Sequence, residues 1–272
     1  MRTRFHTETL PPKIALELEG IGRLYRRNGF WELEHGLPLD LERYRSHLQA
    51  DVNTFPERFD PAKVGLLVTD LDSTLIGCET IDEIADLLGL REEIAAITER
   101  AMQGELDFAE ALAMRVALLE GLPVERLEEV YRNRYRLEPF ALQTLAQLRR
   151  WGVKTAVVSG GFTFFTDRLL EALPLDFAHA NRLEVKGGRL TGRIEGKVVD
   201  GSGKRAFLEE LRRRFGLAPE EVVAVGDGAN DLQMVEASGF SIGYRPKPIL
   251  RERVDALVLY GDWRTILQLL WR

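Results

Sequence analysis

From the run VGLLVTD (64–70) onward, short apolar runs alternate with amphipathic stretches. The runs KTAVVSGG (154–161) and EVVAVGDG (221–228) are likewise continuous, which is typical of strands buried on both faces of a parallel sheet. FSIGY (240–244) and ALVLY (256–260) are further candidate strands, each followed by a helical stretch. Strands separated by helices indicate βαβ units and therefore predict an α/β fold with a doubly wound parallel sheet.

Two stretches depart from this alternation. Residues 78–136 have a helical pattern almost throughout and follow directly on the first strand. We expect them to form a helical cap inserted into a core made of residues 63–77 and 137–272. RLEVKGGRLTGRIEG (182–196) alternates polar and apolar residues around a Gly-Gly pair, which predicts a β-hairpin.

Residues 1–62 form an N-terminal extension that differs from the rest of the chain. Two stretches, 13–27 and 39–52, have helical periodicity, and VNTFPERFDP (52–61) is predicted to be a linker because it carries two prolines. The segment has no clear βαββαβ pattern and no constellation of reactive side chains. Its role is left open at this stage.

Composition and charge exclude several classes of protein. The chain has 272 residues and 45% hydrophobic residues, enough for a core of ordinary size. Its net charge of −6 argues against a broad basic surface that binds nucleic acid. No run approaches the roughly 18 apolar residues of a membrane span, and the first residues lack the apolar part of a secretory signal. The single cysteine, Cys78, excludes an internal disulfide, so we expect a cytoplasmic protein.

The first strand ends in two carboxylates. Asp70 and Asp72 are two residues apart, so their side chains share a face of the extended chain. Adjacent carboxylates repel unless a metal ion or a lysine neutralises them. The pair suits phosphoryl transfer, because one carboxylate can attack phosphorus while the other protonates the leaving oxygen and then activates water. The alternative is a turn-forming pair that caps a helix.

Two further segments suit an anion. Ser159, Gly160 and Gly161 end the second long strand, where they offer a hydroxyl and unobstructed N–H groups before a helix. Lys204 lies near the start of a predicted helix, where it could neutralise aspartates and a phosphate. Since ligands bind at the carboxyl ends of strands in open α/β sheets, we expect these segments to converge. Taken singly, the Ser159–Gly161 segment is equally compatible with an ordinary turn, and Lys204 with a solvated surface lysine.

The third long strand ends in GDGAND (226–231). Asp227 offers the hard oxygen ligand that Mg²⁺ prefers. Asn230 and Asp231 could orient a water molecule or Lys204. Either of them could instead cap the following helix.

Three residues of the predicted cap suggest the substrate. Glu79 lies where the chain leaves the core, and Phe108 and Arg115 are seven residues apart on one predicted helix, so they point the same way. Arg115 could bind a carboxylate through two hydrogen bonds, although a surface arginine is the alternative. Glu79 could accept an ammonium group. Both groups beside a phosphate site predict an amino-acid phosphate as substrate.

In order and strand context, DLDST (70–74), SGG, Lys204 and GDGAND resemble the motifs of the haloacid dehalogenase superfamily, the aspartate-nucleophile phosphohydrolases. The resemblance covers the chain from Val64 onward and implies the Rossmann-like fold of that superfamily. It also implies that Asp70 is the nucleophile and Asp72 the acid and base. Mg²⁺ would be held by the Asp70 carboxylate, the Asp72 carbonyl and Asp227.

Within that superfamily the chain resembles the phosphoserine phosphatase family. The matching stretches include DLDSTLIGCE (70–79), MQGELDF (102–108) and the segment 159–192, while Ala111 departs from the serine usual in the family. The resemblance implies Mg²⁺-dependent hydrolysis of O-phospho-L-serine to L-serine and phosphate through a phosphoaspartate, the last step of L-serine biosynthesis. Many members also carry an N-terminal amino-acid-binding regulatory domain, whose pattern residues 1–62 do not match.

Other interpretations stay open. The phosphoaspartate could pass its phosphoryl group to an alcohol such as homoserine, or the substrate could be another small phosphomonoester such as phosphohomoserine. A non-catalytic sensor of serine or phosphoserine is a third interpretation. The sequence leaves the metal used in the cell and the assembly undetermined, with a homodimer as one option.

Overall fold

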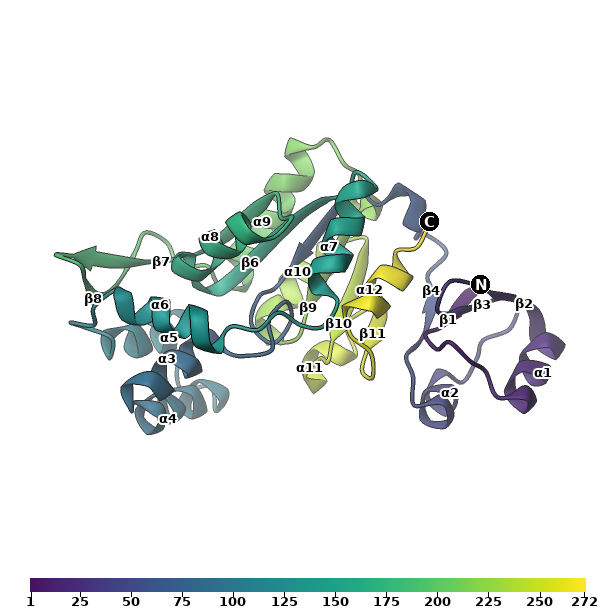
Figure 1. The fold of residues 1–272 in the computed structure, drawn as a ribbon, viewed down its shortest axis with the longest axis horizontal. Helices are drawn as coiled ribbons and strands as arrows, with labels where there is room; N and C mark the ends of the chain where they lie inside the picture. Colours follow the sequence, from purple (N-terminus) through teal and green to yellow (C-terminus); the bar gives the residue numbers. More distant parts are fainter.

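The computed structural model describes the backbone of residues 1–272 and every side chain except that of Met102. It contains two sheets, which lie in separate parts of an elongated molecule (Figure 1). The larger sheet has seven strands in the order β11-β10-β9-β5-β6-β7-β8. The smaller sheet has four strands in the order β2-β3-β1-β4.

The larger sheet confirms the predicted α/β fold. Its strands are β5 (Leu66–Thr69), β6 (Lys154–Phe162), β7 (Phe177–Lys186), β8 (Arg189–Glu195), β9 (Val222–Gly226), β10 (Phe240–Tyr244) and β11 (Ala256–Val258). Neighbouring strands are parallel, except that β7 and β8 form the antiparallel hairpin that the Gly-Gly pattern predicts. All four residues of β5 are buried at the centre of the sheet, between β6 and β9. This position explains the continuous apolar run.

Helices cover both faces of this sheet. They are α7 (Ala141–Arg150), α8 (Thr163–Ala172), α9 (Gly201–Arg214), α10 (Leu232–Glu236), α11 (Pro248–Arg251) and α12 (Trp263–Leu269), with short 3₁₀ turns η1 (Pro61–Lys63), η2 (Pro219–Glu221) and η3 (Ala229–Asp231). Alternate residues of β5 face opposite sides: Leu67 packs in one hydrophobic cluster, and Leu66 and Val68 pack in the other. Residues of α7 and α12 join the first cluster and residues of α9 join the second, so the sheet is doubly wound.

Four helices separate β5 from α7: α3 (Thr80–Leu88), α4 (Arg91–Met102), α5 (Phe108–Ala117) and α6 (Glu125–Arg134). All four lie within the predicted helical segment 78–136, and Figure 1 shows them gathered below the β7–β8 hairpin. The chain leaves and rejoins the core at adjacent points, because Ile76 and Leu137 form a β-bridge and the Gly77 N–H donates to the Arg136 carbonyl over 3.0 Å.

The structure corrects the interpretation of residues 1–62. The segment contains β1 (Arg2–Phe5), α1 (Pro12–Ile21), β2 (Gly22–Arg26), β3 (Trp31–His35), α2 (Leu41–Leu48) and β4 (Val52–Phe55). This βαββαβ order, with antiparallel pairing throughout, is that of a ferredoxin-like unit, so the expectation of no such pattern is wrong.

The helix expected over 13–27 ends at Ile21 for a tertiary reason. Residues 22–26 pair with β3, and a Cβ on Gly22 would lie 2.1 Å from the Glu34 carbonyl oxygen, so only glycine permits this approach. Helical periodicity in this stretch is overridden by the gain from strand pairing. The expected linker 52–61 likewise begins with strand β4.

The N-terminal unit packs against β10 and β11 of the larger sheet. The side-chain amide of Asn53, on β4, donates to the Leu257 carbonyl over 3.0 Å and accepts from the Leu257 N–H over 2.8 Å. It therefore takes the place of a further strand at the edge strand β11. Nearby, the rings of Phe59 and Phe240 stack with centroids 3.8 Å apart, and both residues are buried.

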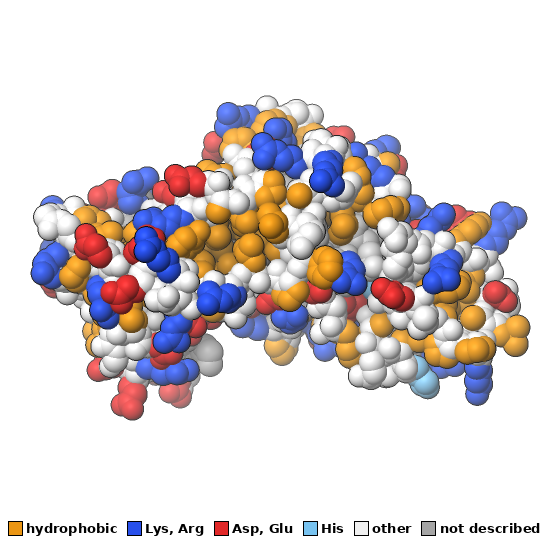
Figure 2. All heavy atoms as spheres, in the orientation of Figure 1, with side chains coloured by type: hydrophobic (Ala, Val, Ile, Leu, Met, Phe, Trp, Pro, Cys, Tyr) orange, Lys and Arg blue, Asp and Glu red, His pale blue; other side chains and the backbone are white. Residues whose placement is uncertain are grey.

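The surface agrees with the expectation, drawn from the net charge, that the protein has no broad basic face. On the face drawn in Figure 2, basic and acidic side chains are interspersed and are not gathered by sign. Among the helices that the structure describes, none is long and apolar enough to cross a bilayer.

Candidate active site

A buried ion pair lies at the carboxyl end of the central strand. Asp70 directly follows β5, and its N–H donates to the Val225 carbonyl of β9 over 2.9 Å. The ammonium group of Lys204, in the first turn of α9, lies 2.6 Å from the Asp70 carboxylate and 2.7 Å from that of Asp231. All three side chains are at most 3% exposed. The lysine therefore joins α9 to the ends of two strands.

The charges of this cluster depend on one another. Burial raises the pKa of Asp70, and the neighbouring Asp231 carboxylate raises it further, whereas Lys204 lowers it. Burial alone would lower the pKa of Lys204, but the Asp231 and Asp70 carboxylates raise it overall. We conclude that the lysine carries its charge.

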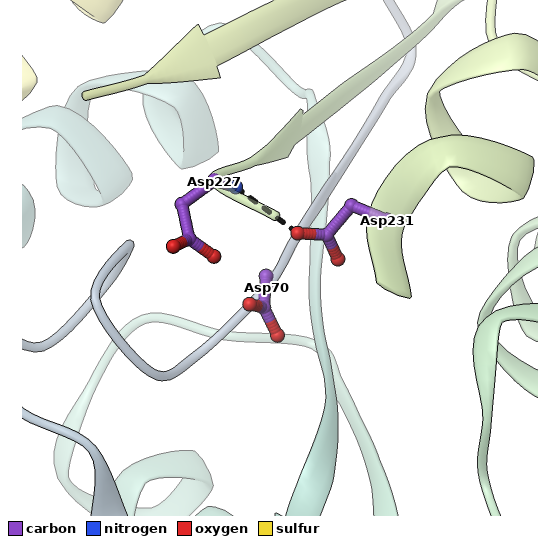
Figure 3. Close-up of side chains that lie close together, drawn as sticks. All are labelled: Asp70, Asp227 and Asp231. Carbon is purple, nitrogen blue, oxygen red and sulfur yellow. Dashed lines mark hydrogen bonds between the residues drawn. The ribbon is translucent and has the colours of Figure 1, made fainter. Parts of the chain in front are cut away.

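Three carboxylates form a site suited to a divalent cation. Oxygen atoms of Asp70, Asp227 and Asp231 all lie within 4.8 Å of one another (Figure 3). One Asp231 oxygen accepts the N–H groups of Asp227 and Gly228 over 3.0 and 3.1 Å, which fixes the turn after β9. Such a set of hard oxygen atoms fits Mg²⁺. That Asp72 supplies its carbonyl oxygen stays a prediction.

Lys247 is a site residue that the sequence analysis missed. Its ammonium group lies 3.1 Å from the Asp227 carboxylate, and its N–H donates to the Asp227 carbonyl over 2.8 Å. It precedes α11, far along the chain from the other motifs. A lysine in a loop carries no local signal of such a contact, so only the folded chain reveals it.

Asp72 is held by hydrogen bonds on both carboxylate oxygens. One oxygen accepts the N–H of Thr80 over 2.7 Å and also contacts the Thr80 hydroxyl, and the other accepts the Ser159 hydroxyl over 3.0 Å. Burial and the charge of Glu79 raise the pKa of Asp72 to about 6, although these hydrogen bonds oppose the rise. The carboxyl group can therefore gain or lose a proton near neutral pH. Thr80 was not among the predicted site residues, although it begins the helix directly after Glu79.

The glycines after Ser159 allow close approach from two sides. A Cβ on Gly160 would lie 2.7 Å from the ring of Phe108, and one on Gly161 would lie 3.2 Å from a carboxylate oxygen of Asp72. The Gly161 N–H donates to the Ser159 hydroxyl oxygen over 2.8 Å. A side chain at position 160 would therefore meet Phe108, and one at position 161 would crowd Asp72.

The α3–α6 segment supplies the opposite wall. Glu79 accepts a hydrogen bond from the Ser73 hydroxyl over 2.9 Å, and the Arg115 side chain donates to the Ala111 carbonyl of its own helix over 3.2 Å. Burial lowers the pKa of Arg115, while Asp82 and Glu79 raise it. Phe108 and Arg115 lie on α5 and face the same cavity, as the seven-residue spacing predicts.

All these groups surround one cavity of about 100 Å³. That volume is far below the roughly 300–1,000 Å³ of sites for drug-sized ligands, so a small molecule fits best. The predicted site residues that line it are Asp70, Asp72, Glu79, Phe108, Arg115, Gly160, Gly161, Asp227 and Asn230. Ser159 and Lys204 are fully buried and contact Asp72 and Asp70 directly. The structure thus brings every predicted site residue to one place.

Comparisons with known proteins agree with this geometry. Residues 67–236 match the model of the haloacid dehalogenase-like hydrolases. A phosphoserine phosphatase of Archaeoglobus fulgidus is 47% identical over 218 residues, which are 80% of this chain and 63% of that protein. One from Polaromonas is 45% identical over 209 residues, 75% of this chain and 89% of that protein.

Solved structures extend the similarity to the whole chain. A hydrolase of the same superfamily from Salmonella enterica serovar Typhi has a TM-score of 0.89 at 31% identity, covering 99% of this chain and 98% of its own. A probable phosphoserine phosphatase from Vibrio cholerae has a TM-score of 0.85 at 33% identity, covering 99% of this chain and 85% of its own. A substrate-bound phosphoserine phosphatase covers 76% of this chain and 98% of its own, with a TM-score of 0.71 at 43% identity. This chain therefore belongs to the haloacid dehalogenase-like hydrolases and, among them, to the phosphoserine phosphatase family.

Proposed function

We propose that this protein is a Mg²⁺-dependent phosphatase that hydrolyses O-phospho-L-serine to L-serine and phosphate. One observation carries the proposal: a single small cavity is lined by Asp70, which is ion-paired with the buried Lys204, and by the charged residues Glu79 and Arg115. A phosphate monoester, an ammonium group and a carboxylate are the three charged groups of phosphoserine. The names of the relatives support the same substrate.

The proposed binding mode follows from charge. The phosphoryl group lies against Asp70, where the ammonium of Lys204, the Asn230 amide and the Gly160 N–H balance its negative oxygens. The Ser159 hydroxyl and the Gly161 N–H would exchange their present contacts for further phosphoryl oxygens. Glu79 accepts the substrate ammonium, and Arg115 binds the carboxylate. Phe108, whose ring closes on Gly160, excludes water from the reacting atoms.

Two steps complete the proposed reaction. A carboxylate oxygen of Asp70 attacks phosphorus in line, the bond from phosphorus to the serine oxygen breaks, and the Asp72 carboxyl group donates its proton to that oxygen. A water molecule then attacks the phosphoaspartate. Asp72 takes a proton from this water, the bond between phosphorus and the Asp70 oxygen breaks, and phosphate leaves.

Of the three clustered carboxylates, we propose that those of Asp70 and Asp227 would hold Mg²⁺, with the Asp72 carbonyl as a further ligand. When bound, the ion supplies positive charge that offsets the charge developing on the phosphoryl oxygens. Asp231, which binds Lys204 and the turn after β9, acts as a positioning residue for both.

We also propose that residues 78–136, which carry helices α3–α6, act as a cap over a catalytic core of residues 63–77 and 137–272. The adjacent exit and return points at Ile76 and Leu137 allow the segment to move as a unit. Because Phe108 and Arg115 both lie on α5, closure of the cap brings a shielding ring and a specificity group to the cavity together.

The proposal is tested by a panel of phosphomonoesters, measured with Mg²⁺, with EDTA, and with EDTA followed by excess Mg²⁺. We expect kcat/KM for phosphoserine to exceed that for sugar phosphates by about 100-fold, since two charged contacts are lost with the latter. EDTA removes the activity and Mg²⁺ restores it. Equal rates on sugar phosphates contradict the substrate assignment, and phosphate release that requires an added alcohol indicates a transferase.

Asp70→Asn is expected to abolish turnover while the protein stays folded, because the amide is not a nucleophile and Lys204 keeps its contact with Asp231. The exposed Asp167 on α8 provides the matched control, Asp167→Asn, which should retain full activity. Phosphate release and circular dichroism are measured together. Activity within about tenfold of the native protein, a barrier change of only about 1.4 kcal/mol, argues against a nucleophilic role.

Arg115→Ala is expected to raise KM for phosphoserine while leaving hydrolysis of an aryl phosphate nearly unchanged, because the aryl ester has no carboxylate to bind. Arg132→Ala, on the exposed side of α6, removes the same charge from the cap without touching the cavity. Steady-state kinetics of both substrates separate the two effects. If both substrates lose activity equally, Arg115 has a structural role.

The pH dependence of the two substrates should differ. Since the pKa of Asp72 is raised to about 6, its carboxyl group loses the proton as the pH rises past that value. A serine alkoxide needs that proton to leave, whereas an aryl oxide does not. We expect the ratio of kcat/KM for phosphoserine to that for the aryl phosphate to fall from about pH 6 to pH 8, approaching tenfold per unit. Asp72→Asn should make the ratio constant, and a constant ratio in the native protein excludes this acid role.

A further inference from the structure

The N-terminal ferredoxin-like unit contacts the active-site core at both ends of α12. We propose that this unit is a positioning element of the active site: Asp51 and Arg4 hold α12, and Trp263 at the start of α12 holds the loop that carries Asp70. The inference rests on the proposed function, because it assigns the loop a catalytic role. The proposal assigns residues 1–62 a role in positioning the catalytic residues.

Asp51 binds the segment that leads into α12. It lies directly before β4, is 1% exposed, and accepts the N–H groups of Leu259, Tyr260 and Gly261 over 2.6, 3.1 and 2.9 Å. A Cβ on Gly261 would lie 2.9 Å from the Asp51 carboxylate and 2.1 Å from the Thr265 hydroxyl. A buried carboxylate that accepts three N–H groups is a strong anchor, and removing one partner leaves polar groups unsatisfied.

Arg4 binds the other end of the same helix. This residue of β1 is 3% exposed and donates to the carbonyls of Gln268, Leu269 and Trp271, the last two over 3.1 Å. The guanidinium adds donors to carbonyls at and just beyond the C-terminal end of α12, where its positive charge also complements the helix dipole. Glu32 orients Arg4 through a 2.8 Å ion pair. The N-terminal unit therefore holds α12 at both of its ends.

Trp263 connects α12 to the loop that carries Asp70. Its side chain is fully buried, and its indole N–H donates to the Thr74 carbonyl over 2.8 Å. Its own backbone is fixed as well, because its N–H donates to the Pro139 carbonyl over 3.2 Å and its carbonyl accepts the Thr144 hydroxyl over 2.8 Å. The indole is thus a rigid donor to a loop that starts four residues earlier at Asp70.

The loop needs such a support because its backbone is strained. Ser73 has a φ of 55°, a left-handed conformation that a residue other than glycine adopts only when its surroundings enforce it. The N–H of Ser73 donates to the Cys78 carbonyl over 3.2 Å, and Trp263 holds the next carbonyl along. A relaxed loop would turn Asp70 and Asp72 away from their contacts, and misplacement of about 1 Å lowers a rate by about 100-fold.

A double-mutant cycle tests the connection. Trp263→Phe keeps an aromatic ring but removes the N–H donor, and Asp51→Asn keeps the shape of the anchor but removes its charge. We expect each variant to lower kcat by about 3- to 10-fold for phosphoserine and aryl phosphate alike, because both substrates need the same nucleophile. The double variant should resemble the stronger single variant, since the two changes break one chain of contacts.

Asp40→Asn is the control within the same unit, because Asp40 caps α2 through the Arg43 N–H at an exposed position. It should leave kcat unchanged and combine additively with Trp263→Phe. If Asp51→Asn does not fold, Arg4→Lys enters the cycle in its place, since it keeps the charge and loses the fork of donors. Additive effects of Trp263→Phe and the anchor variant overturn the proposal.

Hydrogen exchange gives a measurement that does not require activity. In Asp51→Asn, amides of residues 71–76 should exchange at least several-fold faster than in the native protein and in Asp40→Asn, because loosening of α12 reaches the loop. Unchanged exchange in these residues overturns the proposal, even for an active enzyme. A native protein that releases no phosphate from any ester instead overturns the proposed function and leaves this measurement to decide the mechanical connection.

Discussion

The ammonium group of Lys204, buried between the Asp70 and Asp231 carboxylates, is the interaction on which the arrangement of the site depends. Asp70 directly follows the central strand, Asp231 follows the neighbouring strand β9, and Lys204 lies in the first turn of helix α9, so one cation joins three parts of the core. A buried pair of this kind does not contribute much net stability. The loss of one partner nevertheless destabilises the fold, because it leaves an unpaired charge in the interior. We infer that this ion pair fixes the position of the proposed nucleophile.

The order of the strands decides which groups meet around that pair. Because β5 lies between β6 and β9, the residues that follow these three strands lie at one edge of the sheet. The hydroxyl of Ser159 thereby reaches Asp72, and the carboxylate of Asp227 reaches that of Asp70. The α3–α6 segment then closes the cavity with Glu79 and Arg115, whose charges suit a small zwitterion. In the proposed function, the core supplies groups for the phosphoryl chemistry, and the α3–α6 segment supplies groups that select the substrate.

Sequence reasoning succeeded where function depends on residues near one another in the chain. The buried strands, the helices α3–α6, the β7–β8 hairpin and the motifs at the strand ends follow from local periodicity and spacing. It failed for the N-terminal unit, where the helical pattern of residues 22–26 gave way to pairing with β3. It also missed Thr80, which contacts Asp72 only eight residues away, and it missed Lys247 and Trp263, whose partners lie far along the chain. Lys247 and Trp263 matter because of the residues they contact in the folded chain. Neither of the two segments that form such a contact predicts it by its own sequence.

By itself the sequence determined the α/β character of the core, the helical nature of the segment 78–136 and the set of acidic, basic and glycine residues able to act on a phosphate ester. These follow from hydrophobic periodicity and residue chemistry, which are properties of short stretches. Only the tertiary structure decided that residues 1–62 form a ferredoxin-like unit. It also decided that Asp51 and Arg4 bind the two ends of α12, and that Trp263 supports the strained turn at Ser73. The physical reason is that burial and long-range hydrogen bonding override weak local propensities, and both arise only once the distant segments have packed together.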